Sequence, residues 1–529
     1  MSIYCKPNLV LEPMVNNWYA WPYLISPASY SLILTNHHQR MLQSFLRNPE
    51  QHKRMASRML GGPFVDHDVN KKDFVEELVK KNEANNPELY ELAQAIQELT
   101  KICNEHKIGD SLEPLYDKVP DALKGLVEFG YDLHNNLSPR LFEGALYKSK
   151  YFKKERQSLL LYLNEGDTRP FILSTPRFPS ETAIQIEVPF DHELVDKLFK
   201  MRYQSGDDSI IDELLKNAVG DVTKQQLEQF FTTQAPKLNP PKCNTDEVTA
   251  RYFNHATVLF SYNDFHVMTD PIVALQDEKG ALEDRWTYED LPEKIDYVIL
   301  THNHQDHVVF ETLLQLRHRI GTIIVPRSHN GFIQDPSLRL ILENTGFKNI
   351  VELGEFEELN LPFGTIAGMP FLGEHGDLHI ASKLTYFLKM NEKKFFIGAD
   401  ANNLSPEMYQ IAQDYFGDIP NVFVGMECKG APMSWLYGPM LQVPMSRSQD
   451  EMRRLNGSDA RKALSLLESL NAKKVFVYAM GAEPWLSFIS SIDYDINSQP
   501  IVESNKLIEE CQAQGVEAER LFGKAEISF

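Results

Sequence analysis

Hydrophobic and polar residues follow two different patterns along the chain, and the change falls near residue 240. Apolar side chains recur at helical spacing over residues 87–99, which predicts a helix that packs through one face. Apolar runs at 158–163 and 183–188 predict strands, and a second helix is predicted around 210–215. The first part of the chain is therefore predicted to be a mixed α+β region.

A proline-rich segment separates this part from the rest. Residues 234–242 contain three prolines, which lack the backbone N–H that a helix or a sheet requires. We therefore place a boundary there and predict two domains, residues 1–240 and residues 245–529.

Short strands alternate with helices beyond the boundary. A hairpin is predicted over residues 257–270 and helices over 310–316 and 460–470, the latter capped by Ser458 or Asp459. Further strands are predicted at 295–300, 322–326, 384–388, 394–397, 422–424 and 474–478. Several of them end in acidic or glycine-rich loops, as is typical of a layered α/β enzyme whose site lies at strand ends.

Composition narrows the class of protein. With 529 residues, 43% of them hydrophobic and 24% charged, the chain is long enough for two large cores. No apolar stretch approaches the roughly 20 residues that span a bilayer, and the first residues lack the pattern of a secretory signal. Five scattered cysteines with no Cys-x-x-Cys pair are typical of free thiols. We therefore expect a cytoplasmic protein.

The net charge disfavours two classes of partner. The chain has 53 Lys and Arg against 74 Asp and Glu, a formal net charge of -21. Such a charge repels polyanions and anionic lipid. We therefore expect no nucleic-acid substrate and no membrane association.

The segment 301–307, Thr-His-Asn-His-Gln-Asp-His, carries the strongest chemical signal. It places four potential metal ligands directly after the predicted strand 295–300. His302 and His304 can project from one side of an extended segment, while Asp306 and His307 follow a turn and can face a second ion. Imidazole combined with carboxylate suits zinc, iron or manganese. A polar loop that is merely rich in histidine is the structural alternative.

The His-x-His-x-Asp-His pattern resembles the metallo-β-lactamase superfamily. Asp270-Pro271, Gly373-Glu374-His375-Gly376-Asp377 and Gly398-Ala399-Asp400 occur in the order that this superfamily uses. The resemblance implies an α/β fold, an αββα sandwich over roughly residues 250–485, with a dinuclear metal site at one edge and with the α+β region preceding it.

The chain departs from the zinc hydrolases of that superfamily at two ligand positions. The last histidine of the chain is His379, so a C-terminal histidine ligand is missing, and the middle motif offers Glu374 beside His375. By resemblance, the first metal would bind His302, His304, Glu374 and a bridging Asp400. The second would bind Asp306, His307 and Asp400. His375 stays open as an alternative ligand or as a supporting residue, and we favour Glu374.

This oxygen-rich set resembles one branch of the superfamily, the non-haem diiron β-hydroxylases related to the chloramphenicol-pathway enzyme. The resemblance extends over nearly the whole chain, including residues 6–13, 18–23, 425–432, 434–439 and 481–485. It implies two iron ions, O2 as co-substrate, and a monooxygenase that hydroxylates an amino-acid-like group on a carrier domain of a non-ribosomal peptide synthetase. It also implies that the N-terminal region forms a homodimer.

Other residues have weaker signals. Glu427 follows a predicted strand and is expected to assist catalysis near the metals, whereas His255 is expected to be structural or to support a ligand. Tyr437 and Trp485 are candidates for a substrate pocket, although core packing is the commoner role for an aromatic residue. Since no dinucleotide or nucleoside-triphosphate motif is present, electrons would come from a separate donor protein.

Two rival functions remain at this point. A dinuclear zinc or manganese hydrolase would use a metal-bound hydroxide instead of O2. A metal-binding partner of a synthetase without catalytic activity would leave the complete set of six ligands unexplained.

Overall fold

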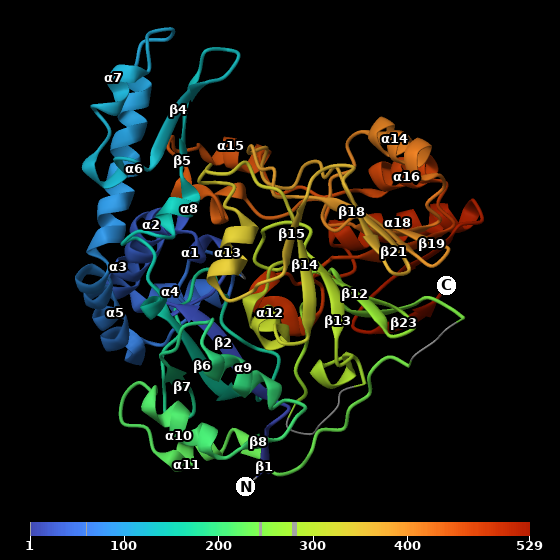
Figure 1. Ribbon diagram of the computed structural model, residues 1–529, viewed down its shortest axis with the longest axis horizontal. Helices are drawn as coiled ribbons and strands as arrows, with labels where there is room; N and C mark the ends of the chain where they lie inside the picture. The colour runs from blue at the N-terminus through green and yellow to red at the C-terminus, as the bar shows by residue number, and fades with distance from the viewer. Residues whose placement is uncertain (1, 60, 243–245, 278–282) are drawn as a thin grey trace.

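The second part of the chain, residues 249–529, is called the catalytic half after its predicted role, and it is built from two stacked seven-stranded sheets. The structure is a computed structural model that describes residues 2–59, 61–242, 246–277 and 283–529 (Figure 1). Cys243 and the predicted start of the second domain at residue 245 lie outside the described residues.

The first of these sheets precedes the second in the chain, apart from its last strand. Its order is β15-β14-β13-β12-β11-β10-β23. Its strands are β10 (Thr249–Asn254), β11 (Thr257–Tyr262), β12 (Phe265–Thr269), β13 (Ile295–Ile299), β14 (Ile320–Pro326), β15 (Ile350–Leu353) and β23 (Ala525–Ser528). Strands β12 to β15 are parallel, with Thr269 beside Ile299 and Ile299 beside Ile324, so their carboxyl ends meet at one edge.

The second sheet has the order β16-β17-β18-β19-β20-β21-β22. Its strands are β16 (Glu358–Leu361), β17 (Gly364–Met369), β18 (Thr385–Met390), β19 (Lys393–Ile397), β20 (Asn421–Gly425), β21 (Lys474–Tyr478) and β22 (Glu517–Arg520). Strands β19 to β22 are again parallel. Each sheet therefore ends its parallel strands in loops that can share one site.

The two sheets pack face to face, and helices cover their outer faces. Large apolar side chains fill the space between the sheets, and the rings of Phe260 and Phe395 lie 4.9 Å apart there. The helices of this half are α12 (Phe310–Leu316), α13 (Leu338–Asn344), α14 (Pro406–Phe416), α15 (Arg447–Met452), α16 (Ala460–Leu470), α17 (Ser487–Ser490) and α18 (Gln499–Ala513). The predicted αββα sandwich is confirmed.

The N-terminal part is mixed α+β, also as predicted. Its strands are β1 (Ser2–Cys5), β2 (Leu9–Val15), β3 (Trp18–Tyr19), β4 (Val127–Tyr131), β5 (Leu137–Leu141), β6 (Gln157–Leu163), β7 (Ile184–Ile186), β8 (Gly206–Asp207) and β9 (Phe231–Thr232). Its helices are α1 (Pro22–Ile25), α2 (Pro27–Ile33), α3 (Gln39–Arg47), α4 (Pro49–Ala56), α5 (Lys72–Asn85), α6 (Pro87–Glu105), α7 (Glu113–Tyr116), α8 (Glu143–Leu146), α9 (Glu193–Lys200), α10 (Ser209–Lys216) and α11 (Lys224–Glu228).

Among the described residues, no helix is both long and apolar enough to cross a membrane. The cysteines among the residues that the structure describes form no disulfide; they are Cys5, Cys103, Cys428 and Cys511.

A buried ionic network joins the N-terminal sheet to helix α12. Glu12 on β2 accepts hydrogen bonds from Arg169 and Arg177, and Arg169 also donates to Glu311 on α12 at 2.8 Å. Burial alone would raise the pKa of Glu12, but Arg177 and Arg169 outweigh it and lower that pKa to about 2. Helix α12 starts three residues after His307, so this network holds the N-terminal part against the helix that directly follows the segment of potential ligands, residues 301–307.

We expect Glu12→Ala to lower the free energy of unfolding by about 3–5 kcal/mol, because it leaves two arginines buried with fewer partners. Glu128→Ala is the control, since Glu128 pairs with Arg140 at the surface, with side chains 48% and 43% exposed. That pair should contribute at most about 1 kcal/mol. Denaturant unfolding of both variants makes the comparison, and equal losses would show that the network does not stabilise the fold.

Candidate metal centre

The residues predicted to bind metal converge at the carboxyl ends of the parallel strands. His302, His304, Asp306 and His307 follow β13, while Asp400 follows β19. Glu374 lies in the loop after β17. His302 Nε2 and Glu374 Oε1 each lie 3.1 Å from His304 Nδ1, so these three residues direct their ligand atoms at one point.

A second set of ligand atoms lies beside the first, and Asp400 touches both. Asp400 Oδ2 is 2.9 Å from His307 Nε2 and 3.9 Å from His302 Nε2. Asp306 and His307 form a further possible ligand group with His255, whose Nε2 is 3.1 Å from His307 Nε2 and 3.6 Å from Asp306 Oδ2. The arrangement has the form of two adjacent sites that share one carboxylate.

Glu427 completes a group of three carboxylates in the cluster. Its carboxylate lies with those of Glu374 and Asp400, with ligand atoms within 4.8 Å of one another. It lies two residues after Gly425, the last residue of β20, so it reaches the site from the same edge of the second sheet as Asp400. The residue is partly buried and its Oε2 is inaccessible to solvent, so it is a member of the site and not a solvated loop residue.

The electrostatics of the cluster fit divalent cations. Burial, reinforced by Asp400 and Asp306, raises the pKa of Glu374 well above its ordinary value, and burial with Glu374 and Asp400 raises that of Glu427. Burial also lowers the pKa of His302 well below its usual range. Within the described part of the chain, Glu374 Oε2, Asp400 Oδ1 and Glu427 Oε2 are buried without a hydrogen-bond partner. Bound cations would satisfy these oxygens and allow the carboxylates to ionise.

Two groups of neighbours hold the histidine rings. Asp270 Oδ2 lies 2.8 Å from His307 Nδ1, and Asp270 also accepts hydrogen bonds from the backbone and hydroxyl of Thr301. On the other side, the Tyr437 hydroxyl lies 2.9 Å from both His304 Nε2 and His375 Nδ1. These contacts leave His307 Nε2 and His304 Nδ1 directed at the cluster.

Backbone strain is concentrated around the same residues. Glu374 has φ 66°, Ala399 before Asp400 has φ 43°, and Asp270 has φ 32°, all in the left-handed region that non-glycine residues rarely adopt. Gly373 supports this geometry, since a Cβ there would lie 2.4 Å from Asn402 Cβ. Such strain persists only where the surroundings enforce it, which is typical of a functional site.

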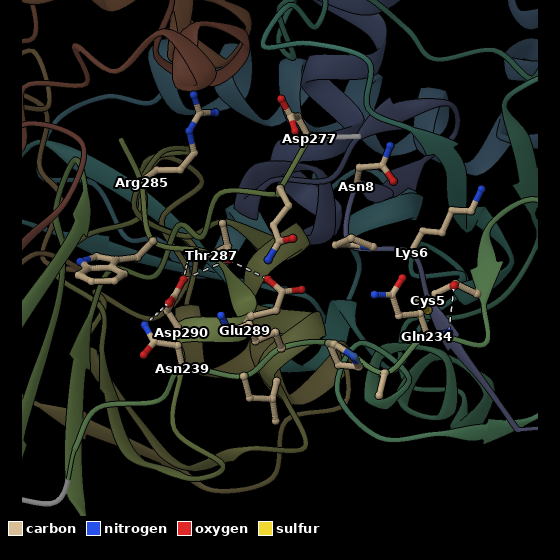
Figure 2. A pocket seen from close by; sticks show the side chains of 18 of the residues that line it. Cys5, Lys6, Asn8, Gln234, Asn239, Asp277, Arg285, Thr287, Glu289 and Asp290 are labelled. Atoms are coloured by element: carbon tan, nitrogen blue, oxygen red, sulfur yellow. Dashed lines mark hydrogen bonds between the residues drawn. The ribbon is translucent and has the colours of Figure 1, made fainter. Parts of the chain in front are cut away.

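A large cavity elsewhere in the molecule does not reach the cluster. It has a volume of about 960 Å3 and lies between β1 and the segments that contain residues 234–239 and 285–290 (Figure 2). Its lining includes Lys6, Arg285 and Asp290 but none of the clustered ligands. This cavity is therefore separate from the cluster of potential ligands.

Comparisons with known proteins agree with the arrangement of potential ligands for two metal ions. Residues 4–236 match the family model described as "Diiron non-heme beta-hydroxylase N-terminal domain", and residues 249–367 match "Beta-lactamase superfamily domain". The chain is 34% identical over 523 residues to the 4-amino-L-phenylalanyl-[CmlP-peptidyl-carrier-protein] 3-hydroxylase of Streptomyces venezuelae, with 98% of each chain covered.

This relationship decides the family. The chain belongs to the diiron non-haem β-hydroxylases. The crystal structure of CmlA, a diiron β-hydroxylase from Streptomyces venezuelae, superposes with a TM-score of 0.93 at 33% identity, covering both chains completely. A CmlA variant with a glutamate-to-aspartate substitution gives a TM-score of 0.91 at 32% identity, again with complete coverage.

The prediction of a hydroxylase on a metallo-β-lactamase fold is thereby confirmed, and the family implies two iron ions for this β-hydroxylase. The assignment of each ligand stays a prediction. The structure brings all six predicted metal ligands together, with Glu427 and His375 beside them.

Three residues lie closer to the predicted ligands than the sequence indicated. Asp270 marks a superfamily motif, but its contact with His307 spans 37 positions of the chain, and that between Tyr437 and His304 spans 133. His255 lies within reach of Asp306 and His307, so it is closer to the ligands than its sequence context suggests. The left-handed turn that places His255 there, φ 42°, has no clear sequence signal.

We expect Asp270→Asn to lower the affinity of this β-hydroxylase for its second ion by about 10–100-fold, because the ring of His307 loses its carboxylate partner. The first ion should be retained. Asp296→Asn provides the control, since Asp296 accepts from the backbone of His266 away from the cluster. Titration with a competing chelator measures both affinities, and equal affinities in the two variants would contradict the role given to Asp270.

Proposed function

We propose that the protein hydroxylates the β-carbon of an amino-acid-like group that is tethered to a peptidyl-carrier domain, using O2 and two bound iron ions. The observation that carries this proposal is the carboxylate Glu374 in the group with His302 and His304, where a zinc hydrolase would present a third histidine. Two histidines with a carboxylate are a ligand set that non-haem iron uses in oxygenases.

We propose that His302 Nε2, His304 Nδ1 and Glu374 hold the first ion, that Asp306 and His307 hold the second, and that Asp400 bridges them. The distances to Asp400 and the buried unpaired oxygens support this assignment. When bound, the iron ions would supply the redox chemistry that inserts one oxygen atom of O2 into a C–H bond while the other leaves as water.

The chain's own residues would orient and enclose that chemistry. Asp270 holds the ring of His307, and Tyr437 with His375 holds the ring of His304. Glu427 places a carboxyl group beside Glu374 and Asp400, where it can hold a proton close to the reacting atoms.

The chemistry also defines the partners. Each turnover takes up two electrons and two protons besides O2, so we propose a separate electron-donor protein. The carrier domain of a non-ribosomal peptide synthetase is the proposed substrate partner, since the Streptomyces venezuelae relative is named for a carrier-bound aminoacyl substrate. A homodimer formed through the N-terminal region and a cytoplasmic location complete the proposal.

The test uses iron-loaded, chemically reduced protein and a panel of carrier domains loaded with 4-aminophenylalanine, phenylalanine or tyrosine. With 18O2, the account predicts one aminoacyl group that gains a single labelled oxygen at the β-carbon and stays on its carrier. Release of the aminoacyl group without oxygen incorporation would instead support a metal-dependent thioester hydrolase.

A further inference from the structure

A cleft of about 750 Å3 lies between the N-terminal part and the catalytic half. One wall comes from α6 and β5, through residues such as Leu99, Thr100 and Leu137. The opposite wall is made by three loops of the catalytic half, residues 329–334, 377–379 and 437–442. Its volume falls within the range of roughly 300–1,000 Å3 that small-molecule sites occupy.

Two of the three loops of the second wall adjoin the metal centre. Tyr437 lines the cleft, and its hydroxyl is 2.9 Å from His304 Nε2. Asp377 also lines the cleft and lies three residues after Glu374. The cleft therefore reaches the layer of residues that contacts the ligand histidines.

The N-terminal part also contacts two residues of the second wall. The ring of Tyr23 packs edge-on against Tyr437 with centroids 6.0 Å apart, and its hydroxyl donates to the backbone carbonyl of Gln334 at 2.8 Å. Both Tyr437 and Gln334 line the cleft. The N-terminal part thus shapes the surroundings of the catalytic centre.

The lining has a definite chemical character. It includes apolar side chains together with hydroxyl and amide groups, the carboxylate of Asp377 and the imidazoles of His329 and His379, while no lysine or arginine is among the residues that line it. A free amino acid would bring a carboxylate into this cleft beside the carboxylate of Asp377, where the lining offers it no lysine or arginine and only the imidazoles of His329 and His379 as partners, which is less favourable than binding a neutral group. An aminoacyl thioester has no such charge, and amide groups along a tether find donors and acceptors in Gln334, Gln442 and Ser138.

We propose that this cleft is the route by which a thioester-tethered aminoacyl group reaches the metal centre, with the tether leaving between α6 and the loop of residues 437–442. The inference rests on the proposed function for the identity of the substrate. It assigns the N-terminal part a direct role in substrate access.

The test introduces a cysteine into the wall of the cleft and then attaches groups of different size to its thiol. Thr100→Cys places the thiol on the lined face of α6, while Gln94→Cys places it on the exposed face of the same helix and serves as the matched control. Both variants are made in a Cys103→Ser background, because Cys103 is also on α6 and is partly exposed. Each is modified with a methyl or a bulky benzyl methanethiosulfonate reagent, and the background protein is treated in parallel.

Two readouts are needed. The first is kcat/KM for hydroxylation of an aminoacyl-loaded carrier domain. The second is the rate at which 4-nitrocatechol, an aromatic iron chelator, develops its visible absorption with the iron-loaded protein, which requires no hydroxylase turnover. We expect the benzyl group at residue 100 to lower both by more than 10-fold, the methyl group to have a small effect, and modification at residue 94 to have none.

The two readouts separate the failure of each proposal. Unchanged nitrocatechol binding in benzyl-modified Thr100→Cys, or equal losses at residues 94 and 100, would overturn the cleft as the access route. If no protein hydroxylates any carrier but nitrocatechol binding slows only at residue 100, the route stands and the proposed function fails.

Discussion

Replacing Asp400 with alanine is expected to remove both metal ions and to abolish turnover. Asp400 Oδ2 lies 2.9 Å from His307 Nε2 and 3.9 Å from His302 Nε2, so in the proposed ligand assignment its carboxylate would contact both ions and set their separation. The loss should exceed the about 10–100-fold decrease in metal affinity or activity that follows removal of a supporting residue. Elemental analysis of the purified variant measures this directly.

Asp418→Ala is the matched control for Asp400→Ala. Asp418 is an exposed carboxylate that accepts hydrogen bonds from Gln413 and Asn471 at the surface of the same half of the molecule. The Asp418 variant should keep its metal and its activity. If Asp400→Ala retains two ions and turns over normally, the bridge lies elsewhere in the cluster.

The pair Glu374→Ala and His375→Ala is expected to separate the ligand from its neighbour. Glu374 Oε1 lies 3.1 Å from His304 Nδ1, the nitrogen directed at the cluster, whereas His375 Nδ1 lies 2.9 Å from His304 Nε2 on the opposite side of that ring. Glu374→Ala should therefore weaken the binding of the first ion and abolish O2-dependent turnover. His375→Ala should retain both ions and lose activity only partly, through a less well-oriented His304.

The metal content and the oxygenase activity of both variants must be measured on the same samples. The assignment is wrong if His375→Ala loses its metal while Glu374→Ala keeps both its metal and its oxygenase activity. In that case the first site would have three histidines, as in a zinc hydrolase, and the proposed function would lose the observation that carries it.

The fold was predictable where local pattern and final structure agree. The runs at 295–300 and 474–478 form strands whose side chains are mostly buried between the other sheet and a helical layer, as those of parallel strands usually are. Strand β22, Glu517–Arg520, was not foreseen because it is polar and lies at a sheet edge. Strand β23 pairs with β10 across more than 270 positions, a contact that no local pattern indicates.

Some residues of the candidate site were also predictable from the sequence, and others were not. The metal loop was visible because its ligands are adjacent in sequence, and the resemblance to a family supplied Glu374 and Asp400. The hydroxyl of Tyr437 and the carboxylate of Asp270 approach their histidines only through folding. A cleft walled by α6 on one side and by residues 437–442 on the other is likewise a property of the assembled chain.

The metal content of the protein, purified without chelators, tests the central claim most directly. A carboxylate-rich cluster shared by two sites should carry about two iron atoms per chain, with the near-ultraviolet absorption of an oxo-bridged pair. Analysis by mass spectrometry and the absorption spectrum of the same sample give both quantities. Two iron atoms with that absorption are the result predicted here; stoichiometric zinc without iron, together with zinc-supported hydrolysis, would contradict the assignment as an oxygenase.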